Sequence, residues 1–148
     1  MPIPISKTYK PAPDDGWHVF CPKFVTEAYL PMWIFTSRRL LRLLSFNFAS
    51  AMALYPVILV KHKALKNNAV LINHEKIHLR QQIETGILLF YLWYLLEYLV
   101  RLGQYRRHRL AYENISFERE AFAHEHDLHY LQHRKPWRFL SYLRQPAA

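Results

Sequence analysis

The spacing of apolar and polar residues predicts a long helical stretch in the middle of the chain, from Ala69 to about His108. Its first part, residues 69–85, is mixed in polarity, whereas residues 86–102, GILLFYLWYLLEYLVRL, are apolar on almost every side. Gly103 is the predicted break at the end of this stretch. The pattern therefore indicates a helix of mixed polarity that runs directly into a much more apolar one.

Three shorter helices flank this stretch. Residues 116–133 form the second predicted helix, with Ser116 as its N-cap. Residues 37–47, SRRLLRLLSFN, are predicted to form a short amphipathic helix with Ser37 as its N-cap. The C-terminal sequence KPWRFLSYLRQPAA predicts a short basic and aromatic helix followed by a frayed tail.

Only one segment has the composition of a strand. Residues 50–61 form a β-branched and aromatic run that Pro56 interrupts, which favours a single short edge strand. Residues 1–36 hold six of the nine prolines and predict an extended, aromatic arm rather than a helix. We therefore expect a mainly α protein with a Pro-rich N-terminal arm (1–36) and a single helical, zincin-like domain (37–148) that has one short edge strand.

The net charge of the chain indicates which classes of binding partner it favours. Twenty Lys and Arg against eleven Asp and Glu give a net charge of +9, which favours anionic partners such as lipid headgroups or nucleic acid. The basic residues are spread along the chain and no nucleic-acid motif is visible, so nucleic acid is the weaker of the two. Cys21 is the single cysteine and no signal-peptide pattern opens the chain, so we expect a cytoplasmic or membrane-associated protein.

The motif that indicates chemistry is HEKIH, formed by His74, Glu75 and His78. Histidines four residues apart lie on one face of a helix, where both rings reach one zinc ion. Glu75 then projects beside the metal, where it can take a proton from zinc-activated water. The pattern predicts a Zn²⁺ site with Glu75 as general base.

A catalytic zinc ion needs a third protein ligand, and the sequence NISFEREAFA offers two candidates. Glu118 and Glu120 are two residues apart, about 200° around a helix, so only one of them can face the metal. Glu118 shares a face with Ala121, Phe122, Glu125 and Leu128, which is the more apolar side near the glutamate. We therefore favour Glu118, with Glu120 as the alternative.

HEKIH followed by a helix bearing FEREA resembles the gluzincin group of zinc metallopeptidases, in which a downstream glutamate is the third ligand. The CAAX-prenyl-type and heat-shock-type membrane endopeptidases have E-x-x-A-D there. Glu118 and Ala121 match its Glu and Ala, whereas Phe122 stands in place of Asp. The resemblance covers about a third of the chain, which is also similar to short, uncharacterised bacterial HExxH proteins. It implies a peptide or protein substrate, held along an edge strand for which Met52–Val60 is the candidate. The same run fits equally a core strand that contacts no ligand.

The apolar residues 86–102 allow two interpretations. They form either the buried central helix of a soluble bundle or a helix that enters or lies on an anionic membrane surface. Glu97 and Arg101 lie inside the stretch, and basic residues flank it on both sides.

Other candidate groups are weaker. The histidines between His124 and His133 suggest either a second metal site or, more simply, a solvated helix face. Tyr105 and Tyr112 are candidates for oxyanion donors or for buried aromatic residues.

Two functions follow from these patterns. The first is a zinc-dependent hydrolase, a metallopeptidase with zinc on His74, His78 and Glu118. The second is a non-catalytic, basic membrane-associated or helical interaction protein whose metal site is structural or vestigial. A fourth protein ligand such as His124 would favour the second.

Overall fold

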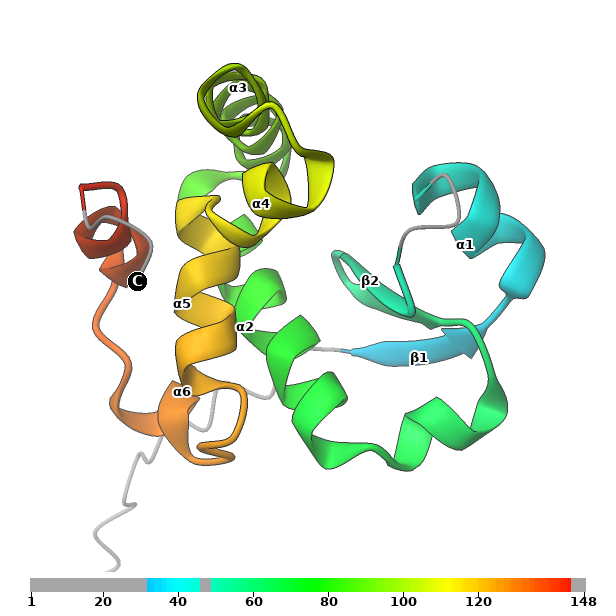
Figure 1. The fold of residues 1–148 in the computed structure, drawn as a ribbon. Coiled ribbons are helices and arrows are strands. Elements are labelled where there is room, and N and C mark those ends of the chain that lie inside the picture. Colours follow the sequence, from blue (N-terminus) through cyan, green and yellow to red (C-terminus); the bar gives the residue numbers. More distant parts are fainter. Residues whose placement is uncertain (1–31, 46–48, 145–148) are drawn as a thin grey trace, which may run out of the picture.

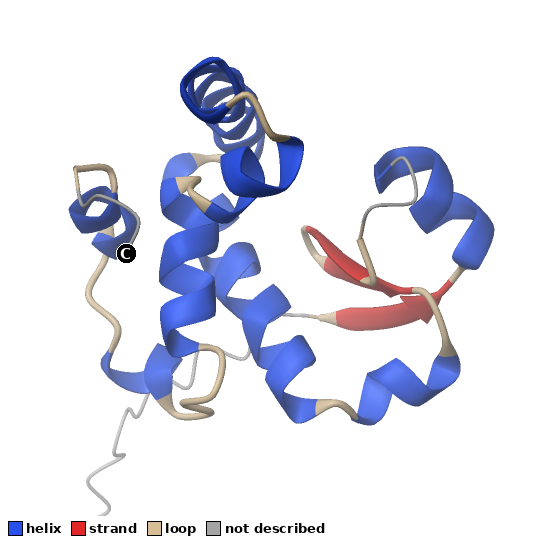
Figure 2. Ribbon diagram, viewed as in Figure 1, coloured by secondary structure: helices blue, strands red, loops and turns tan. Residues whose placement is uncertain are grey.

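The computed structural model describes residues 32–45 and 49–144, and most of the predicted arm lies outside these ranges. The predicted mainly helical class is confirmed: most of the described residues are helical, and one small sheet lies at one side (Figure 2). The last residues of the predicted arm, Trp33–Thr36, form strand β1 of that sheet.

The sheet has three strands in the order β1-β3-β2. Strand β3 (Val57–Val60) lies in the centre, parallel to β1 and antiparallel to β2 (Ala51–Leu54). The segment predicted as one edge strand thus forms a hairpin, because the chain turns at Pro56, which has no backbone N–H for a strand ladder. Strands β1 and β2 are the two edges of the sheet, so only the β2 half of the predicted edge strand lies at an edge.

Helix α1 (Arg38–Ser45) connects β1 to β2 and begins as predicted, with the Leu40 amide donating to the Ser37 hydroxyl at 3.3 Å. The remaining elements follow β3 along the chain. They are η1 (Lys63–Asn67), α2 (Ala69–Thr85), α3 (Ile87–Tyr105), α4 (His108–Glu113), α5 (Ser116–His124), α6 (Tyr130–His133) and η2 (Arg138–Tyr142).

The predicted long helix bends sharply at Gly86, where α2 ends and α3 begins at an angle of 110°. Gly86 has a φ of 80°, a conformation that L-residues rarely adopt, so this glycine is the break. The sequence predicted the break at Gly103 instead. Helix α3 continues through Gly103 and ends at Tyr105.

The predicted helix 116–133 is likewise divided, into α5 and α6. The side-chain amide of Asn73, on α2, lies within 3.3 Å of the carbonyl oxygens of His124, Glu125 and Asp127. Carbonyl groups at the end of a helix need such donors, and Asn73 satisfies them where α5 stops. The last turn of α5 is thereby held against α2.

Helix α2 lies between the sheet and α5, and α3 crosses above them (Figure 1). On the sheet side, an apolar cluster joins β2, β3 and α2 through residues that include Ile58, Val60 and Leu79. On the other side, Phe117 of α5 packs with Phe90 of α3 and Phe139 of η2. The element between these two cores is the helix that carries HEKIH.

Within the described residues, no single helix has both the length and the apolar character needed to cross a membrane. Helices α2 and α3 pass the same criterion of length and composition only when taken together as a bent pair.

Candidate metal centre

Three buried side chains from two helices meet between α2 and α5. The Nε2 atoms of His74 and His78 lie 3.1 Å apart, as expected for histidines one helical turn apart. The two carboxylate oxygens of Glu118 each lie 3.3 Å from one of these nitrogens. Together these side chains form a group that could hold a metal ion, with its ligand atoms within 4.8 Å of one another.

The tautomer of His78 is fixed by Gln81, one turn further along α2. Gln81 donates its amide N–H groups to the Phe117 carbonyl oxygen at 3.2 Å and to Glu120 Oε2 at 3.0 Å. Its amide oxygen therefore faces His78 Nδ1, at 2.8 Å, and accepts a hydrogen bond from it. With the proton on Nδ1, His78 Nε2 presents a lone pair to the centre of the cluster.

The tautomer of His74 is fixed by a carboxylate from beyond the end of α5. Glu125 Oε2 lies 2.9 Å from His74 Nδ1, which donates to it. Such a carboxylate partner orients a metal-binding imidazole and increases its basicity. His74 Nε2, like that of His78, therefore directs its lone pair inward.

Two lone pairs and one carboxylate thus converge on a single point without a hydrogen-bond donor between them. Glu118 Oε2 is buried, and although His74 Nε2 is near it, it has no hydrogen-bond partner among the described residues. Buried anionic and lone-pair groups repel one another unless a cation lies between them. The arrangement therefore fits a metal cation, and two imidazole nitrogens with one carboxylate are typical zinc ligands.

A proton can take the place of that cation. Burial lowers the pKa of His78, but the adjacent Glu118 carboxylate, together with Glu75 and Gln81, more than offsets this effect and raises the pKa to about 9. For Glu118, burial raises the pKa, yet the His78 and His74 imidazoles lower it well below its usual value. Without metal, His78 and Glu118 form a buried ion pair near neutral pH.

Glu120, the alternative third ligand, faces away from the cluster. Its carboxylate pairs with the Arg134 guanidinium and accepts a hydrogen bond from the Tyr130 hydroxyl at 2.8 Å. Arg134 also pairs with Glu84 of α2, at 2.6 Å. This buried network connects the end of α2 to α5, and through Glu120 it also holds the side-chain amide of Gln81.

Glu97, the carboxylate inside the apolar stretch, holds the start of α5. It accepts hydrogen bonds from the Ser116 amide at 2.9 Å and from the Ser116 hydroxyl at 2.6 Å. Ser116 is therefore the first residue of the helix rather than its N-cap, which is Ile115. A carboxylate at a helix N-terminus is favourable, and here it fixes the helix that carries Glu118.

The Glu75 side chain is buried beside the cluster and faces the edge of the sheet. Burial raises its pKa, the two imidazoles lower it, and a hydrogen bond from the backbone of Ala53 lowers it further, with a net rise. The Ala53 carbonyl on β2 accepts from Gln82 Nε2 at 3.0 Å and from the Tyr91 hydroxyl at 3.2 Å. The edge strand thus lies next to Glu75, with its nearest carbonyl already bonded within the chain.

Tyrosines of α3 and α4 complete the surroundings. Tyr94 donates to Glu118 Oε1 at 2.7 Å, and both burial and Glu118 raise the pKa of Tyr94 and of Tyr112. Burial and Glu75 raise the pKa of Tyr91 to about 12, which keeps its hydroxyl protonated. Tyr105, at the far end of α3, is about three helical turns from Tyr94.

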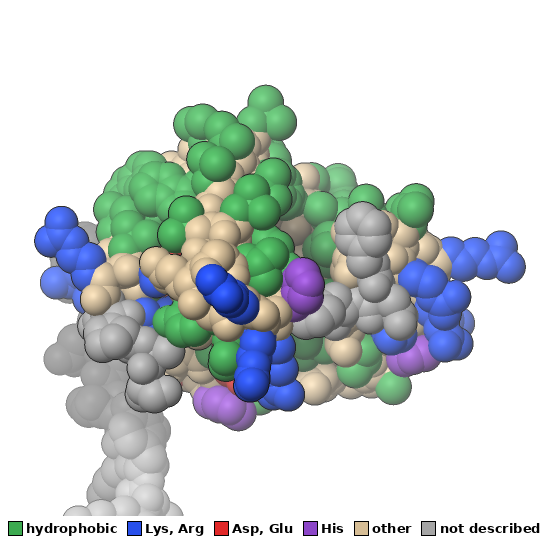
Figure 3. Space-filling view, turned by 45° about the horizontal axis from the view of Figure 1, so that its top comes forward, with side chains coloured by type: hydrophobic (Ala, Val, Ile, Leu, Met, Phe, Trp, Pro, Cys, Tyr) green, Lys and Arg blue, Asp and Glu red, His purple; other side chains and the backbone are tan. Residues whose placement is uncertain are grey.

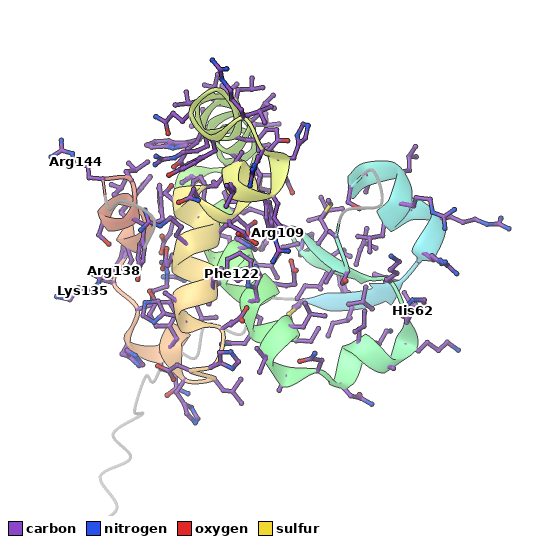
Figure 4. The ribbon with its side chains drawn as sticks, in the orientation of Figure 1. His62, Arg109, Phe122, Lys135, Arg138 and Arg144 are labelled. Carbon is purple, nitrogen blue, oxygen red and sulfur yellow. The ribbon has the colours of Figure 1, made fainter. Side chains whose placement is uncertain are left out.

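Phe122 forms an exposed wall of the site. Its ring packs edge-on against His74 at 4.8 Å and against Tyr112 at 6.2 Å. It points from α5 into the space between α5 and the sheet (Figure 4). Where the resembling families have an aspartate, this chain has an apolar ring, and Glu125 supplies the carboxylate to His74.

Among the described residues, the His74, His78 and Glu118 group is the one set that could hold a metal. His124 does not join it: its Nε2 lies 2.9 Å from the Tyr142 hydroxyl, and its ring stacks on Tyr130. His126 and His133 lie at the surface and face the carboxylates of Glu125 and Asp127.

Sequence reasoning missed Gln81, Glu125 and Tyr94. The first two had a periodic signal, because Gln81 lies three residues after His78 and Glu125 seven residues after Glu118 on the same helical face. Tyr94 had none, since the bend at Gly86 brings it to Glu118.

No protein-family model, curated protein or solved structure matches this chain.

Proposed function

We propose that this protein is a zinc-dependent hydrolase, and specifically a metallopeptidase. The observation that carries the proposal is the convergence of His74 Nε2, His78 Nε2 and the Glu118 carboxylate on one buried point. Three protein ligands of this kind leave a fourth position open, which distinguishes catalytic from structural zinc sites. The orientation of His124 toward Tyr142 supports an open fourth position, since it was the candidate fourth ligand.

Glu75 is the proposed general base. A zinc ion held by the three ligands would supply a Lewis acid that acidifies water and polarises a carbonyl group. Glu75 takes the proton from that water and delivers it to the leaving amine. The raised pKa of Glu75 suits both steps, because a carboxylate with a pKa nearer neutrality both accepts and releases a proton readily.

Tyr91 is the proposed donor to the developing oxyanion. Tyr91 remains protonated at neutral pH and lies on the side of Glu75 and β2. An extended peptide would lie along β2, with its backbone bonded to this edge and its side chain against Phe122. Gln82 and Tyr91 donate hydrogen bonds to the Ala53 carbonyl oxygen, so a peptide N–H would have to replace one of these donors to bond that oxygen.

The metal claim is tested by zinc analysis of the purified protein after dialysis against trace zinc. We expect one zinc per chain in the wild type and none in the His74→Ala/His78→Ala variant. A matched control, His126→Ala/His133→Ala, removes two exposed histidines and is expected to retain the zinc. Equal zinc in all three proteins would contradict the site.

The catalytic claim is tested separately with Glu75→Gln on a library of unstructured peptides. This variant keeps the shape of the side chain and is expected to bind zinc as the wild type does. We expect it to lose hydrolysis by at least about a hundredfold, the usual contribution of a general base. Unchanged hydrolysis with zinc bound would exclude Glu75 as the base, and absence of cleavage by the zinc-loaded wild type would favour a structural site.

A further inference from the structure

The outer face of α3 is an exposed apolar surface that runs the length of the helix. Six leucines on it are each between 52% and 84% exposed: Leu88, Leu89, Leu92, Leu95, Leu96 and Leu99. The 19 residues of α3 extend about 28 Å. A monomeric soluble protein rarely exposes so long an apolar strip, and such strips mark contact with a partner or a membrane.

A groove of about 440 Å³ continues this surface toward η2. Leu92, Leu96 and Trp137 are among its eight lining residues, of which six are apolar and two, Thr85 and Glu97, are not. Three of the six exposed leucines, Leu89, Leu92 and Leu96, line the groove, which therefore adjoins the apolar surface. Both its size and its lining suit a hydrocarbon chain rather than a polar ligand.

The exposed charges of the described residues are almost all of one sign. Of the described Lys and Arg residues, eleven are exposed, whereas the one exposed acidic residue is Asp127. Arg106 and Arg107 follow the end of α3, and Lys135, Arg138 and Arg144 extend from the η2 side (Figure 4). Figure 3 shows the apolar side chains gathered at the top, with basic side chains at both flanks and below.

We propose that α3 docks on the surface of an anionic lipid bilayer. The helix would lie in the interface with its leucines among the acyl chains, the groove would hold part of one chain, and the flanking cations would contact the headgroups. A second copy of the chain is a poorer occupant, because two molecules of charge +9 repel each other. Nucleic acid would use the cations but leave the leucines in water.

The inference is independent of the proposed catalysis and is tested with the full-length, metal-free protein. Co-sedimentation with vesicles of phosphatidylcholine, with and without one third phosphatidylglycerol, measures binding in 0.1 M salt. We expect binding to the anionic vesicles and at least about tenfold weaker binding to pure phosphatidylcholine, since each basic residue near the surface adds about fivefold.

A matched pair of variants tests the apolar contact. Leu95 on the docking face and Leu128 beside α6 are almost equally exposed, at 52% and 53%. Leu95→Glu is expected to weaken binding to anionic vesicles at least about tenfold, because it removes a leucine from hydrocarbon and inserts a charge. Leu128→Glu makes the same change of charge outside the docking face. It is expected to weaken binding to anionic vesicles by no more than about fivefold, the effect of one charge near the membrane surface. Leu88→Glu, at the most exposed of the six leucines, repeats the test, with circular dichroism verifying the fold.

Three results would overturn the proposal. The first is a wild type that does not bind anionic vesicles, and the second is equal binding by Leu95→Glu and Leu128→Glu. The third is a stable dimer in analytical ultracentrifugation that Leu95→Glu dissociates, which would assign the face to a second copy.

Discussion

Each imidazole of the cluster is oriented by a polar group that does not belong to HExxH. Gln81 holds His78, and Glu125 holds His74 from a turn that Asn73 stabilises. The ligand atoms are therefore directed before any cation binds, which reduces the ordering that binding requires. At the scale of single residues, the properties of the site depend on these supporting contacts as much as on the ligands.

Replacing Glu125 by alanine should weaken zinc binding by about 10–100-fold, the usual effect of losing the hydrogen-bond partner of a ligand histidine. Competition with a chromophoric chelator measures the dissociation constant. The control is Glu113→Ala, which removes a carboxylate paired with Arg109 at the surface and should change the constant less than about twofold. Equal constants for the two variants would show that His74 needs no carboxylate.

The His78–Glu118 ion pair predicts how the metal-free protein responds to pH. The folded-state pKa of His78, about 9, lies above its ordinary value of 6.5. The proton bound by the folded state therefore stabilises it fully below pH 6.5, and this contribution is lost as the pH rises through 9. We expect the midpoint of thermal unfolding in chelator to fall across this window.

Zinc affinity should change in the opposite direction over the same range. Because zinc displaces the proton on His78, binding releases it and becomes tighter with rising pH until the pKa is passed. Titration calorimetry in two buffers of different ionisation enthalpy counts the released protons. A proton release near zero at pH 7 would contradict the raised pKa.

At the scale of elements, two glycines in the same helical stretch have opposite roles. Gly86 has a φ of 80° at the bend, whereas Gly103 lies within α3, and a Cβ at either position would meet no atom within 4 Å. Backbone conformation alone therefore decides the effect of an alanine at each.

Gly86→Ala should lower the free energy of unfolding by about 1–2 kcal/mol, because the alanine Cβ opposes a left-handed backbone. Gly103→Ala should raise it by about 0.5–1 kcal/mol, because alanine favours a helix interior. Urea denaturation of the two variants beside the wild type measures both. If both substitutions shift stability in the same direction, the bend is not where the structure has it.

The features that could be predicted from the sequence were those set by the local spacing of residues along a helix. The spacing of His74 and His78 placed both on one helical face, and the apolar neighbours of Glu118 favoured it over Glu120. In the structure Glu118 lies beside the two histidines. The hairpin at Pro56 is also local, but the β-branched run on both sides of the proline resembles one interrupted strand. The division of helix 116–133 depends instead on contacts between distant segments, such as that of Asn73 with the end of α5. Residues that act through such contacts, Tyr94 above all, left no pattern in the sequence.

At the scale of the whole molecule, the cluster lies where two parts of the chain meet, and Ile77 of α2 packs there against Ala121 of α5. His74 and His78 come from a helix whose apolar face covers the sheet, and Glu118 from a helix packed against α3 and η2. Glu97 connects α3 to α5, so the position of Glu118 depends on where α3 lies.

Helix α3 contacts Glu118 through Tyr94 and presents its leucines to the surroundings on the opposite face. Zinc on one side and lipid on the other would therefore act on one rigid element, and their binding energies form a closed thermodynamic cycle. If vesicles tighten zinc binding by some factor, zinc must tighten vesicle binding by the same factor. Measuring both constants in the wild type and in Tyr94→Phe would show whether this helix transmits an effect in either direction, and the two factors must agree.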